Sequence, residues 1–454
     1  MKYLPTLLFL LCCCSFLAAQ PVPFPAPGHE GLNVKKTATL RLDDASQLQL
    51  GIWTQNRVVY DLSNIPGPGG TGFSNTETYD FFRQRFRAAL DVRFVDTTQA
   101  IQAGAYTQLE YRGGWGGSSP AVSDPRGSLP VINPYNRLQP RGARYGFVYL
   151  DYKDKATFSA GILPLTDGMG RVLFDADWDF NVGGIAMSGP FFKTGKYRLA
   201  YVRLIDGIGA ISPKDVGPNS NLYLFDQLYP LSENLNLGAH IYSLDVPADL
   251  GITAVQRQLW LGVSFGAHLH SFKIDGLLIL NNGKIGAETH TGQAFKLGIS
   301  APAGKGSFEL LGLLATGDDE GQTNTRFVTL HQIVGTAGYW GMTHIYTPNG
   351  PSDVNDFGLE IGNNGAGLAT VQGKYNFAIM PGKVNAYAYA GWFRAMKNRN
   401  GSKEMGAEFG GMLTTSLAKY LQLETGAAYA TAGKYFAEDA DGIFEIFSRF
   451  QFTW

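Results

Sequence analysis

The chain is poor in cysteine: of its 454 residues only three are cysteines, and they are consecutive, at 12–14. They lie in an N-terminal apolar segment that resembles an export signal, so the rest of the chain has none. Disulfide bridges, thiol catalysis and cysteine–zinc sites are therefore excluded for the exported part, although disulfides form readily outside the cytoplasm.

Long apolar runs and charged residues are also scarce. Beyond the leader, no stretch approaches the roughly 18 uninterrupted apolar residues that a membrane-spanning helix needs. Only 17 % of the residues are charged and the formal net charge is −1, which gives no sign of a nucleic-acid partner. Two classes remain for an exported chain of this kind: a secreted all-β protein or an outer-membrane β-barrel.

The leader, MKYLPTLLFLLCCCSFLAA, has the form of a secretory signal peptide. Lys2 supplies the positive charge, an apolar core follows, and Ala18 and Ala19 form a small-residue cleavage site. A transmembrane helix and a lipoprotein cut before one of the cysteines are the less favoured alternatives, because the apolar run is short and large residues precede the cysteines. We expect a signal peptide over 1–19, a proline-rich N-terminal arm over 20–36 and a β-barrel over 37–454.

Glycine (57 residues) and aromatic residues (13 %) are abundant, and an alternation of period two recurs almost throughout. In QLWLGVSFGAHLH (258–270), one set of alternate residues is apolar and the other is mixed. Such segments are about ten residues or longer, which is the length of strands that cross a membrane. The sequence predicts an all-β fold, a transmembrane antiparallel β-barrel of about 18 strands.

The expected connections between strands are of two kinds. Short polar turns alternate with long links, as they do between the periplasmic and extracellular ends of outer-membrane barrels. Loops 112–141 and 316–365 are long enough to fold inward and plug or narrow the pore, and the second could instead contain a hairpin or a helix. The long extracellular loops are predicted at 61–78, 112–141, 165–182, 207–220, 245–256 and 316–365.

The C-terminal segment IFEIFSRFQFTW reads as a last strand with one aromatic face. Phe450, Phe452 and Trp454 share the face that would meet lipid. A terminal aromatic residue on such a strand resembles the signal that the barrel-assembly machinery reads. In a soluble protein the same segment would be an exposed aromatic edge prone to aggregation.

Arginine recurs at every second position in FFRQRFRAALDVRF (81–94). Arg83, Arg85, Arg87 and Arg93 share one face, while phenylalanines and aliphatic residues fill the other. Arginine on the lipid face near the midplane would cost about 2–4 kcal/mol each, so these side chains are predicted to face the lumen.

Other charged residues also fall on the side of their predicted strands that faces the lumen. For the arginine row, two functions remain open. It could be a selectivity wall that draws anionic solutes, or an ion-pair network with the acids that braces the barrel. The predicted pore-lining set is completed by Asp91, Glu110, Glu408, Glu424 and Arg449; further candidates are Arg57, Lys273, Asp275, Lys296, Glu309, Lys374, Arg394, Glu404 and Glu445.

Metal and catalytic sites are weakly indicated. Asp175, Asp177 and Asp179 alternate as in a calcium loop, but the glycine and final glutamate of an EF-hand are missing, so a loose loop calcium site is a weak candidate and no cofactor is expected. His268 and His270 lack a third ligand. No serine-elbow or zinc-protease motif is present, so an enzyme is not predicted.

Two long segments and one patch resemble the outer-membrane alginate-export porin family. They are LGLLATGDDEGQTNTRF (311–327), KEMGAEFGGMLTTSLAKYLQLETGAAYATAGKYF (403–436) and LPLTDGMGRVLFDADW (163–178). The resemblance implies an 18-strand barrel with a charged pore and an acidic polysaccharide or another anion as solute. We therefore expect a porin in the outer membrane of a Gram-negative bacterium, in contact with outer-membrane lipid. It would pass small hydrophilic, anionic solutes or an acidic polysaccharide by passive diffusion. A surface adhesin or structural barrel with a plugged lumen is the alternative, and the oligomeric state stays open.

Overall fold

The computed structural model describes residues 34, 36–65, 77–114, 143–152, 155–178, 180–192, 194–205, 220–246, 255–318, 324–330, 338–348 and 358–454. The predicted signal peptide, nearly all of the proline-rich arm and most of loop 112–141 lie outside the described residues. Within the part that is described, no helix is both long enough and apolar enough to cross a bilayer.

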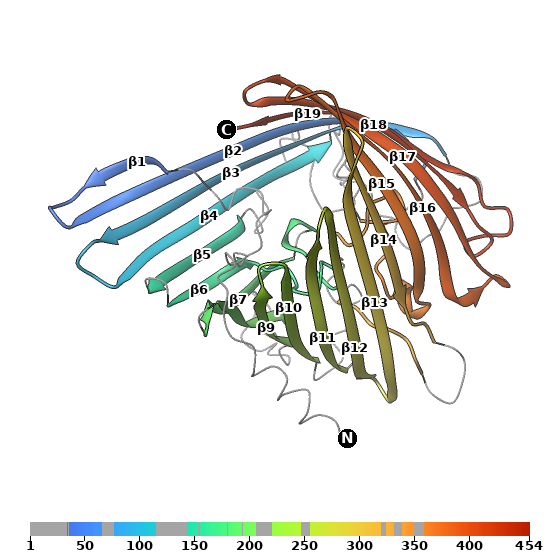
Figure 1. The fold of residues 1–454 in the computed structure, drawn as a ribbon, viewed down its shortest axis with the longest axis horizontal. Coiled ribbons are helices and arrows are strands. Elements are labelled where there is room, and N and C mark those ends of the chain that lie inside the picture. Colours follow the sequence, from blue (N-terminus) through green and yellow to red (C-terminus); the bar gives the residue numbers. More distant parts are fainter. Residues whose placement is uncertain are drawn as a thin grey trace, which may run out of the picture.

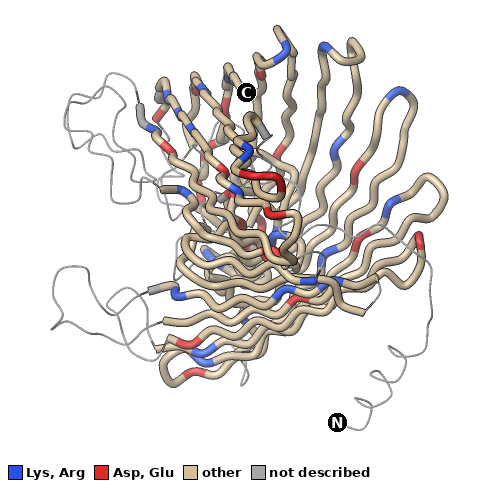
Figure 2. Tube along the Cα trace, turned by 90° about the vertical axis from the view of Figure 1, so that its left-hand side faces the viewer, with Lys and Arg blue, Asp and Glu red and all other residues tan. Residues whose placement is uncertain are grey.

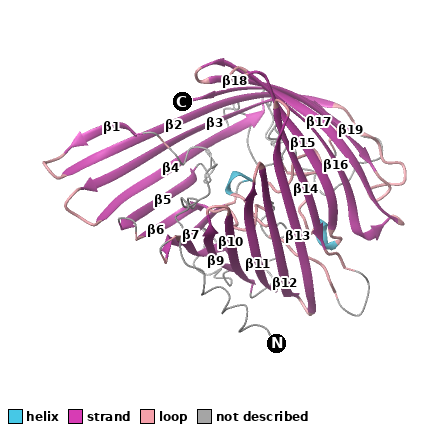
Figure 3. Ribbon diagram, viewed as in Figure 1, coloured by secondary structure: helices cyan, strands magenta, loops and turns pink. Residues whose placement is uncertain are grey.

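Strands make up nearly all of the regular structure. They are β1 (Lys36–Arg41), β2 (Ser46–Ser63), β3 (Tyr79–Asp96), β4 (Ile101–Gly114), β5 (Ala143–Tyr152), β6 (Ala156–Pro164), β7 (Asn181–Phe191), β8 (Gly195–Ile205), β9 (Ser220–Ser232), β10 (Leu235–Val246), β11 (Gln256–Leu269), β12 (Phe272–Ile285), β13 (Glu288–Ala303), β14 (Gly306–Ala315), β15 (Leu368–Met380), β16 (Val384–Arg399), β17 (Ser402–Ala418), β18 (Leu421–Ala432) and β19 (Ile443–Thr453). Two short 3₁₀ turns, η1 (Ala176–Trp178) and η2 (Asn363–Gly365), are the cyan segments in Figure 3.

The strands form one closed antiparallel barrel. Each strand from β2 to β19 pairs with its neighbours in sequence, and β19 pairs back onto β2 from Glu445↔Ser63 to Thr453↔Gln55. This gives the predicted 18 strands. β1 is an additional strand: it pairs with β2 over Gln47–Gly51, beyond the point where β19 ends, and Figure 1 shows it at the projecting edge of the sheet.

The connections differ at the two ends of the barrel, as expected. At one end every link is a short turn; at the other, most of the links are long. β12 and β13 are joined by a two-residue turn, Gly286 and Ala287, so this link is short although it lies at the end with the long connections. Asn400 and Gly401, both with positive φ (50° and 70°), form a similar tight turn between β16 and β17.

The outer face of the barrel is apolar. On β3, Phe82, Phe86 and Leu90 are exposed to the surroundings, whereas Arg83 and Arg87 between them are buried toward the interior. Alternation along a strand produces both faces at once, since successive side chains point to opposite sides. The last strand behaves as predicted, because Phe450, Phe452 and Trp454 lie on the outer face.

Two connections fold into the barrel. The long connection predicted at 165–182 is present between β6 and β7, but it folds into the barrel and buries Met169, Leu173 and Phe174. The described parts of the β14–β15 connection (324–330, 338–348 and 358–367) also lie inside. Contrary to the hairpin or helix that we considered, these parts contain no strand and only the turn η2.

The two inward segments touch each other and share one apolar core with the barrel wall. The backbone at Gly338 lies so close to the carbonyl oxygen of Arg171 that no Cβ atom would fit there. Phe174 and Trp340 belong to the same core as Trp260 of β11. Apolar side chains on the inner face of this side of the barrel are covered by these segments.

Candidate functional site

The arginine row of β3 lies in the interior, where the alternation predicted it. Arg83, Arg85 and Arg87 are 4 %, 7 % and 2 % exposed. Arg85 stands directly opposite Arg57 of β2 on one side and Arg112 of β4 on the other. Like charges at directly opposed positions of a sheet are destabilising. The stability of the fold therefore does not explain why three arginines stand in a line.

One carboxylate is shared among several of these arginines. Glu110 of β4 forms ion pairs with Arg87, with Arg112 at 3.2 Å and with Arg144 at 3.2 Å. Arg85 donates to the neutral amide oxygen of Gln55 at 2.9 Å. A single carboxylate is therefore shared by three cations.

The inner face of β2–β5 carries an excess of positive charge among the described residues. Figure 2 shows the charged residues as short blue and red segments on mostly tan strands. The register and burial assign the following to this wall: seven arginines (Arg57, Arg83, Arg85, Arg87, Arg93, Arg112 and Arg144) and four carboxylates (Asp61, Asp91, Glu110 and Asp151).

Arg93 and Asp91 lie nearer the short-turn end of the same wall. Tyr149 of β5 donates to Asp91 at 2.8 Å and accepts from Arg93 at 3.0 Å. The side chain of Arg93 is 40 % exposed, more than those of the other arginines of the row. This arginine is therefore the member of the row that water in the lumen reaches most easily.

The acids of the last strands are held by other partners. Glu424 pairs with Arg449, both on lumen positions as predicted. Glu408 is buried and accepts from the backbone amides of His344, Ile345 and Tyr346 at 2.7, 2.9 and 2.8 Å. Glu408 thus anchors the inward β14–β15 segment, a role that its own strand does not reveal.

The β6–β7 segment is held by a similar device. The carboxylate of Asp167 accepts from the amides of Met169, Arg171, Leu173 and Phe174 at 2.6–3.0 Å. Burial raises the pKa of Asp167, while the hydrogen bonds from these amides oppose that rise. The carboxylate fixes the turn of the segment from within.

Side chains of the wall complete the anchoring. Arg198 donates to the carbonyl oxygen of Thr166, Arg144 to that of Ala176, and Lys296 to that of Gly170, at 2.8, 2.8 and 2.9 Å. The same Arg198 pairs with Asp226 of β9 at 2.5 Å. Cationic side chains from β5, β8 and β13 therefore fasten one segment to both sides of the lumen.

Asp226 joins a buried polar network that spans four strands, β8 to β11. It accepts from Arg198, from Tyr242 at 2.5 Å, and lies 2.8 Å from Nδ1 of His240, whose Nε2 is 2.9 Å from the hydroxyl of Ser264. No local sequence pattern could reveal this network. Its other members lie 14 to 28 residues from Asp226 along the chain, and Ser264 lies farther still.

The two weak metal candidates that the structure describes, Asp175 and Asp177, both pair with Arg171. Asp175 is buried, accepts from the hydroxyl of Thr166 and the amide of Asp177 at 3.0 Å each, and pairs with Arg171 at 3.3 Å. Asp179 lies outside the described residues. Among the residues that are described, no group of three or more histidine, cysteine or acidic side chains could hold a metal, and His268 and His270 are separately exposed near a turn.

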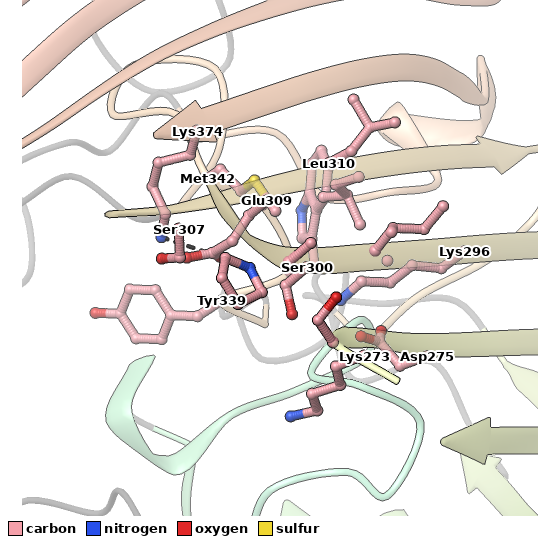
Figure 4. A pocket seen from close by; sticks show the side chains of 18 residues that line it. Lys273, Asp275, Lys296, Ser300, Ser307, Glu309, Leu310, Tyr339, Met342 and Lys374 are labelled. Atoms are coloured by element: carbon pink, nitrogen blue, oxygen red, sulfur yellow. Dashed lines mark ion pairs between the residues drawn. The ribbon is translucent and has the colours of Figure 1, made fainter. Parts of the chain in front are cut away.

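A cavity of about 590 Å³ lies between the wall of β12–β15 and the inward residues Tyr339 to Met342. Figure 4 shows the ion pair of Lys374 with Glu309 at one end and Lys273, Asp275 and Lys296 at the other. The Lys374–Glu309 distance is 3.3 Å. The five charged residues predicted for this part of the lumen are therefore brought together around one polar space.

Two predicted lumen residues face the other way. Arg394 and Glu404 are exposed and stand opposite each other on β16 and β17. Phe393 and Met405, their neighbours in sequence, are buried toward the interior. A β-bulge at Met405 of β17 changes the face of Glu404 relative to Glu408, which simple alternation could not foresee. Arg394 lies on the same outer face of β16 as the exposed Trp392, so its predicted direction was wrong without any irregularity.

The closed antiparallel barrel, with an apolar outer face, a charged interior and inward-folded connections, has the architecture of an outer-membrane porin. The solved structures most similar in shape include the outer membrane protein OpdK of Pseudomonas aeruginosa (12 % identity, TM-score 0.54, covering 89 % of this chain and 98 % of that one). OccAB4 of Acinetobacter baumannii (13 %, 0.56, 89 % and 97 %) and a BenF-like porin of Pseudomonas fluorescens Pf-5 (11 %, 0.54, 89 % and 98 %) are similar to the same extent.

At this level of identity the likeness concerns the fold. No protein-family model matches the chain, and no curated protein does. The resemblance to the alginate-export porin family is not supported by these comparisons, whereas the prediction of an outer-membrane porin barrel is confirmed at the level of the fold.

Proposed function

We propose that the protein is a channel of the Gram-negative outer membrane that lets small hydrophilic solutes, preferentially anions, diffuse passively into the cell. The observation that carries the proposal is the wall of β2–β5, with its seven arginines against four carboxylates. In a narrow space lined by low-dielectric protein, such an excess raises the local concentration of anions.

The arginines act mainly through their field. Arg83, Arg85 and Arg87 are almost fully buried, so a passing solute would meet their potential rather than their hydrogen-bonding groups. Coulomb energies are several-fold larger in such surroundings than in bulk water. Direct contacts would be made by the more accessible charges, Arg93 and the lysines around the 590 Å³ cavity.

The inward segments favour small solutes over an acidic polysaccharide. The described residues of the two inward segments meet inside the barrel and share one core with its wall, which leaves less room for a hydrated polymer. One neighbour in shape, OpdK of Pseudomonas aeruginosa, was solved with vanillate, a small molecule. This supports a small solute, while the identity of the solute is a matter for experiment.

A second candidate function is a structural barrel or adhesin with a plugged lumen. The observation that favours it is the continuous apolar core between both inward segments and the wall, together with the burial of the arginine row. Such a protein would fold and insert identically but would carry no current.

Single-channel conductance in a planar bilayer under a salt gradient separates the two. The channel proposal expects a steady conductance whose reversal potential shows anion preference. Replacing Arg83, Arg85 and Arg87 together by glutamine should move the reversal potential toward zero or cation preference. Arg394→Gln, the same kind of change on the outer face, is the matched control and should leave the reversal potential unchanged.

Each outcome has a definite meaning. Absence of current from correctly folded protein would reject the channel and support the plugged barrel. A current without ion preference, unchanged in the triple variant, would leave a general porin and assign the row to bracing the barrel. Cleavage after residue 19 is checked by sequencing the N-terminus of protein recovered from the outer-membrane fraction.

A further inference from the structure

A row of charged and polar side chains crosses the outer face of β8–β12 at the end with the long connections. The register places Arg203 of β8 opposite Asn221 of β9, and Asn221 opposite Asp245 of β10. The row continues through Asp245↔Arg257 and Arg257↔Lys284 into β12. We call these five residues the outer basic row.

The outer basic row faces away from the lumen. Val202, Leu244 and Gln258, which neighbour its members in sequence, are buried toward the interior, so alternation places the row outside. The side chains of Arg257 and Asp245 are 78 % and 39 % exposed. The row holds three cations (Arg203, Arg257 and Lys284) and one carboxylate (Asp245), a net charge of 3 − 1 = +2.

The arginine at one end of the row is held in position and remains accessible. The hydroxyl of Tyr201 accepts from Arg203 at 2.9 Å and donates to Asn221 at 2.8 Å. Gly183 of β7 stands opposite Arg203, and a Cβ atom there would meet no atom within 4 Å. Tyr201 thus orients the guanidinium, and Gly183 adds no side chain beside it.

The level of the row in the membrane follows from the residues below it. Tyr201 and Tyr223 lie one step nearer the middle of the barrel, with ring centroids 5.4 Å apart. Aromatic girdles mark the boundary between hydrocarbon and headgroups in outer-membrane barrels. The three cations just beyond the tyrosines are therefore at the depth of the headgroups.

An apolar groove begins directly beneath the tyrosines. It has a volume of about 420 Å³ and lies on the lipid-facing surface of the barrel. Apart from the two tyrosines, Ser243 is the one polar residue that lines the groove. The apolar lining comes chiefly from Phe158, Ile185, Met187, Leu199, Phe225 and Ile241.

We propose that the outer basic row and the groove below it form a binding site for a phosphorylated, acylated lipid of the outer leaflet. Its phosphate would lie against Arg203, Arg257 and Lys284, and one acyl chain would occupy the groove. Arginine pairs with phosphate through two parallel hydrogen bonds, which makes it well suited to this headgroup. The site requires a barrel placed in an outer membrane, not an open channel.

The test uses the purified full-length mature protein in detergent and a bisphosphorylated lipid A as the probe. Affinity is measured by native mass spectrometry for the wild type and for Arg203→Gln/Arg257→Gln/Lys284→Gln. We expect at least tenfold weaker binding by the triple variant and no change in Arg394→Gln, an exposed arginine on the outer face of β16. Equal affinity of the triple variant and the wild type would overturn the proposal.

Two further measurements separate the sources of the phosphate and the role of the groove. Dephosphorylated lipid A should bind the wild type as weakly as lipid A binds the triple variant, and inorganic phosphate at the same concentration should not displace lipid A. Displacement by inorganic phosphate would mean an anion site without lipid specificity and would contradict the proposal. Met187→Trp, which fills the groove, should weaken binding of lipid A, and unchanged binding would contradict the place of the acyl chain.

Folding and conduction are followed in the same variants. The heat-dependent shift in gel mobility should be present in all of them, because every replaced side chain is on the surface. Conductance should be unchanged in the triple variant, so failure of lipid binding and failure of the channel proposal are distinguished by separate readouts.

Discussion

Glu408 accepts hydrogen bonds from three consecutive amides of the inward segment and from the hydroxyl of Tyr389 at 2.7 Å. In Glu408→Ala these four donors would lose their acceptor, and each buried polar group left unpaired costs about 1–3 kcal/mol. We expect the segment to leave the wall, with larger and noisier single-channel currents and an earlier loss of heat-resistant gel mobility.

Glu424→Ala is the matched control for this change. Glu424 also lies on the lumen wall, but its partner is the side chain of Arg449 rather than the backbone of an inward segment. Its replacement should leave the current noise near that of the wild type. A quiet, unaltered conductance in Glu408→Ala would contradict the anchoring role.

His344, in the same inward segment, makes the anchoring dependent on pH. Burial, with smaller contributions from Arg449 and Lys374, lowers the pKa of His344 to about 3. The ring lies 4.6 Å from that of Tyr389, and Nε2 is 2.8 Å from the hydroxyl of Tyr387. A released segment would return the histidine to an ordinary pKa near 6.5.

The direction of the pH effect on anchoring follows from which state binds the proton. Above about pH 6.5 both states are neutral and His344 has no effect; as the pH falls toward 3, only the released state binds the proton. At pH 4 the difference favours release by on the order of 3 kcal/mol. We expect current noise to rise between pH 6.5 and 4, and His344→Phe to remove most of that rise; an equal rise in the variant would assign it to other groups.

Single residues were predictable from the sequence where alternation alone sets their direction. The arginines of β3 and Glu424 needed only the parity of their strands. Glu408 and Asp167 have the same kind of side chain, but their partners are backbone amides of folded-in connections. No local pattern encodes those contacts, because the amides of one connection are more than sixty residues from Glu408.

At the scale of elements, the strands were predictable and the inward segment 165–180 was not. Its sequence, LTDGMGRVLFDADWDF, has no regular period and reads as a loop. A signal was nevertheless present in the strands that it covers. Val202, Leu222 and Leu224 are buried apolar residues on the inner face of β8 and β9, beside the polar Arg198 and Asp226. Apolar side chains at such inner positions indicate that protein, not water, covers this part of the wall.

β1 is an element that the barrel does not need for closure. β19 pairs with β2 over residues 55–63, whereas β1 pairs with β2 only over residues 47–51. Deleting residues 34–41 behind an intact export signal should therefore leave barrel assembly and single-channel conductance as in the wild type. A loss of heat-modifiable folded protein would show that β1 takes part in assembly.

Unlike β1, the last strand, β19, takes part in closing the barrel. Phe450, Phe452 and Trp454 remain candidates for the signal that assembly machinery reads, and the backbone of Trp454 also exchanges hydrogen bonds with that of Thr54 at 2.9 Å. Replacing Trp454 by alanine keeps those backbone bonds. A defect of that variant in cells but not in refolding from denaturant would therefore separate recognition by the machinery from closure.

At the scale of the whole molecule, the net charge of −1 offers no preference between anions and cations. Any selectivity must come from where charges lie, and the described residues place the positive excess on one wall of the lumen. Fields of this kind are screened by salt: the Debye length falls from about 10 Å at 0.1 M to about 3 Å at 1 M. Anion preference in the wild type should therefore be strong at 0.1 M and approach the bulk ion ratio at 1 M.

The variant lacking Arg83, Arg85 and Arg87 should show little dependence of the reversal potential on salt, because its wall would hold about as many carboxylates as arginines. The same tenfold salt gradient, measured at low and high mean concentration, compares the two proteins directly. A preference that persists undiminished at 1 M in the wild type would point to contact sites at the accessible lysines and Arg93, since close contacts are screened far less than a field across the lumen. Selectivity would then belong to the cavity beside β12–β15, and the buried row would serve to hold the wall together.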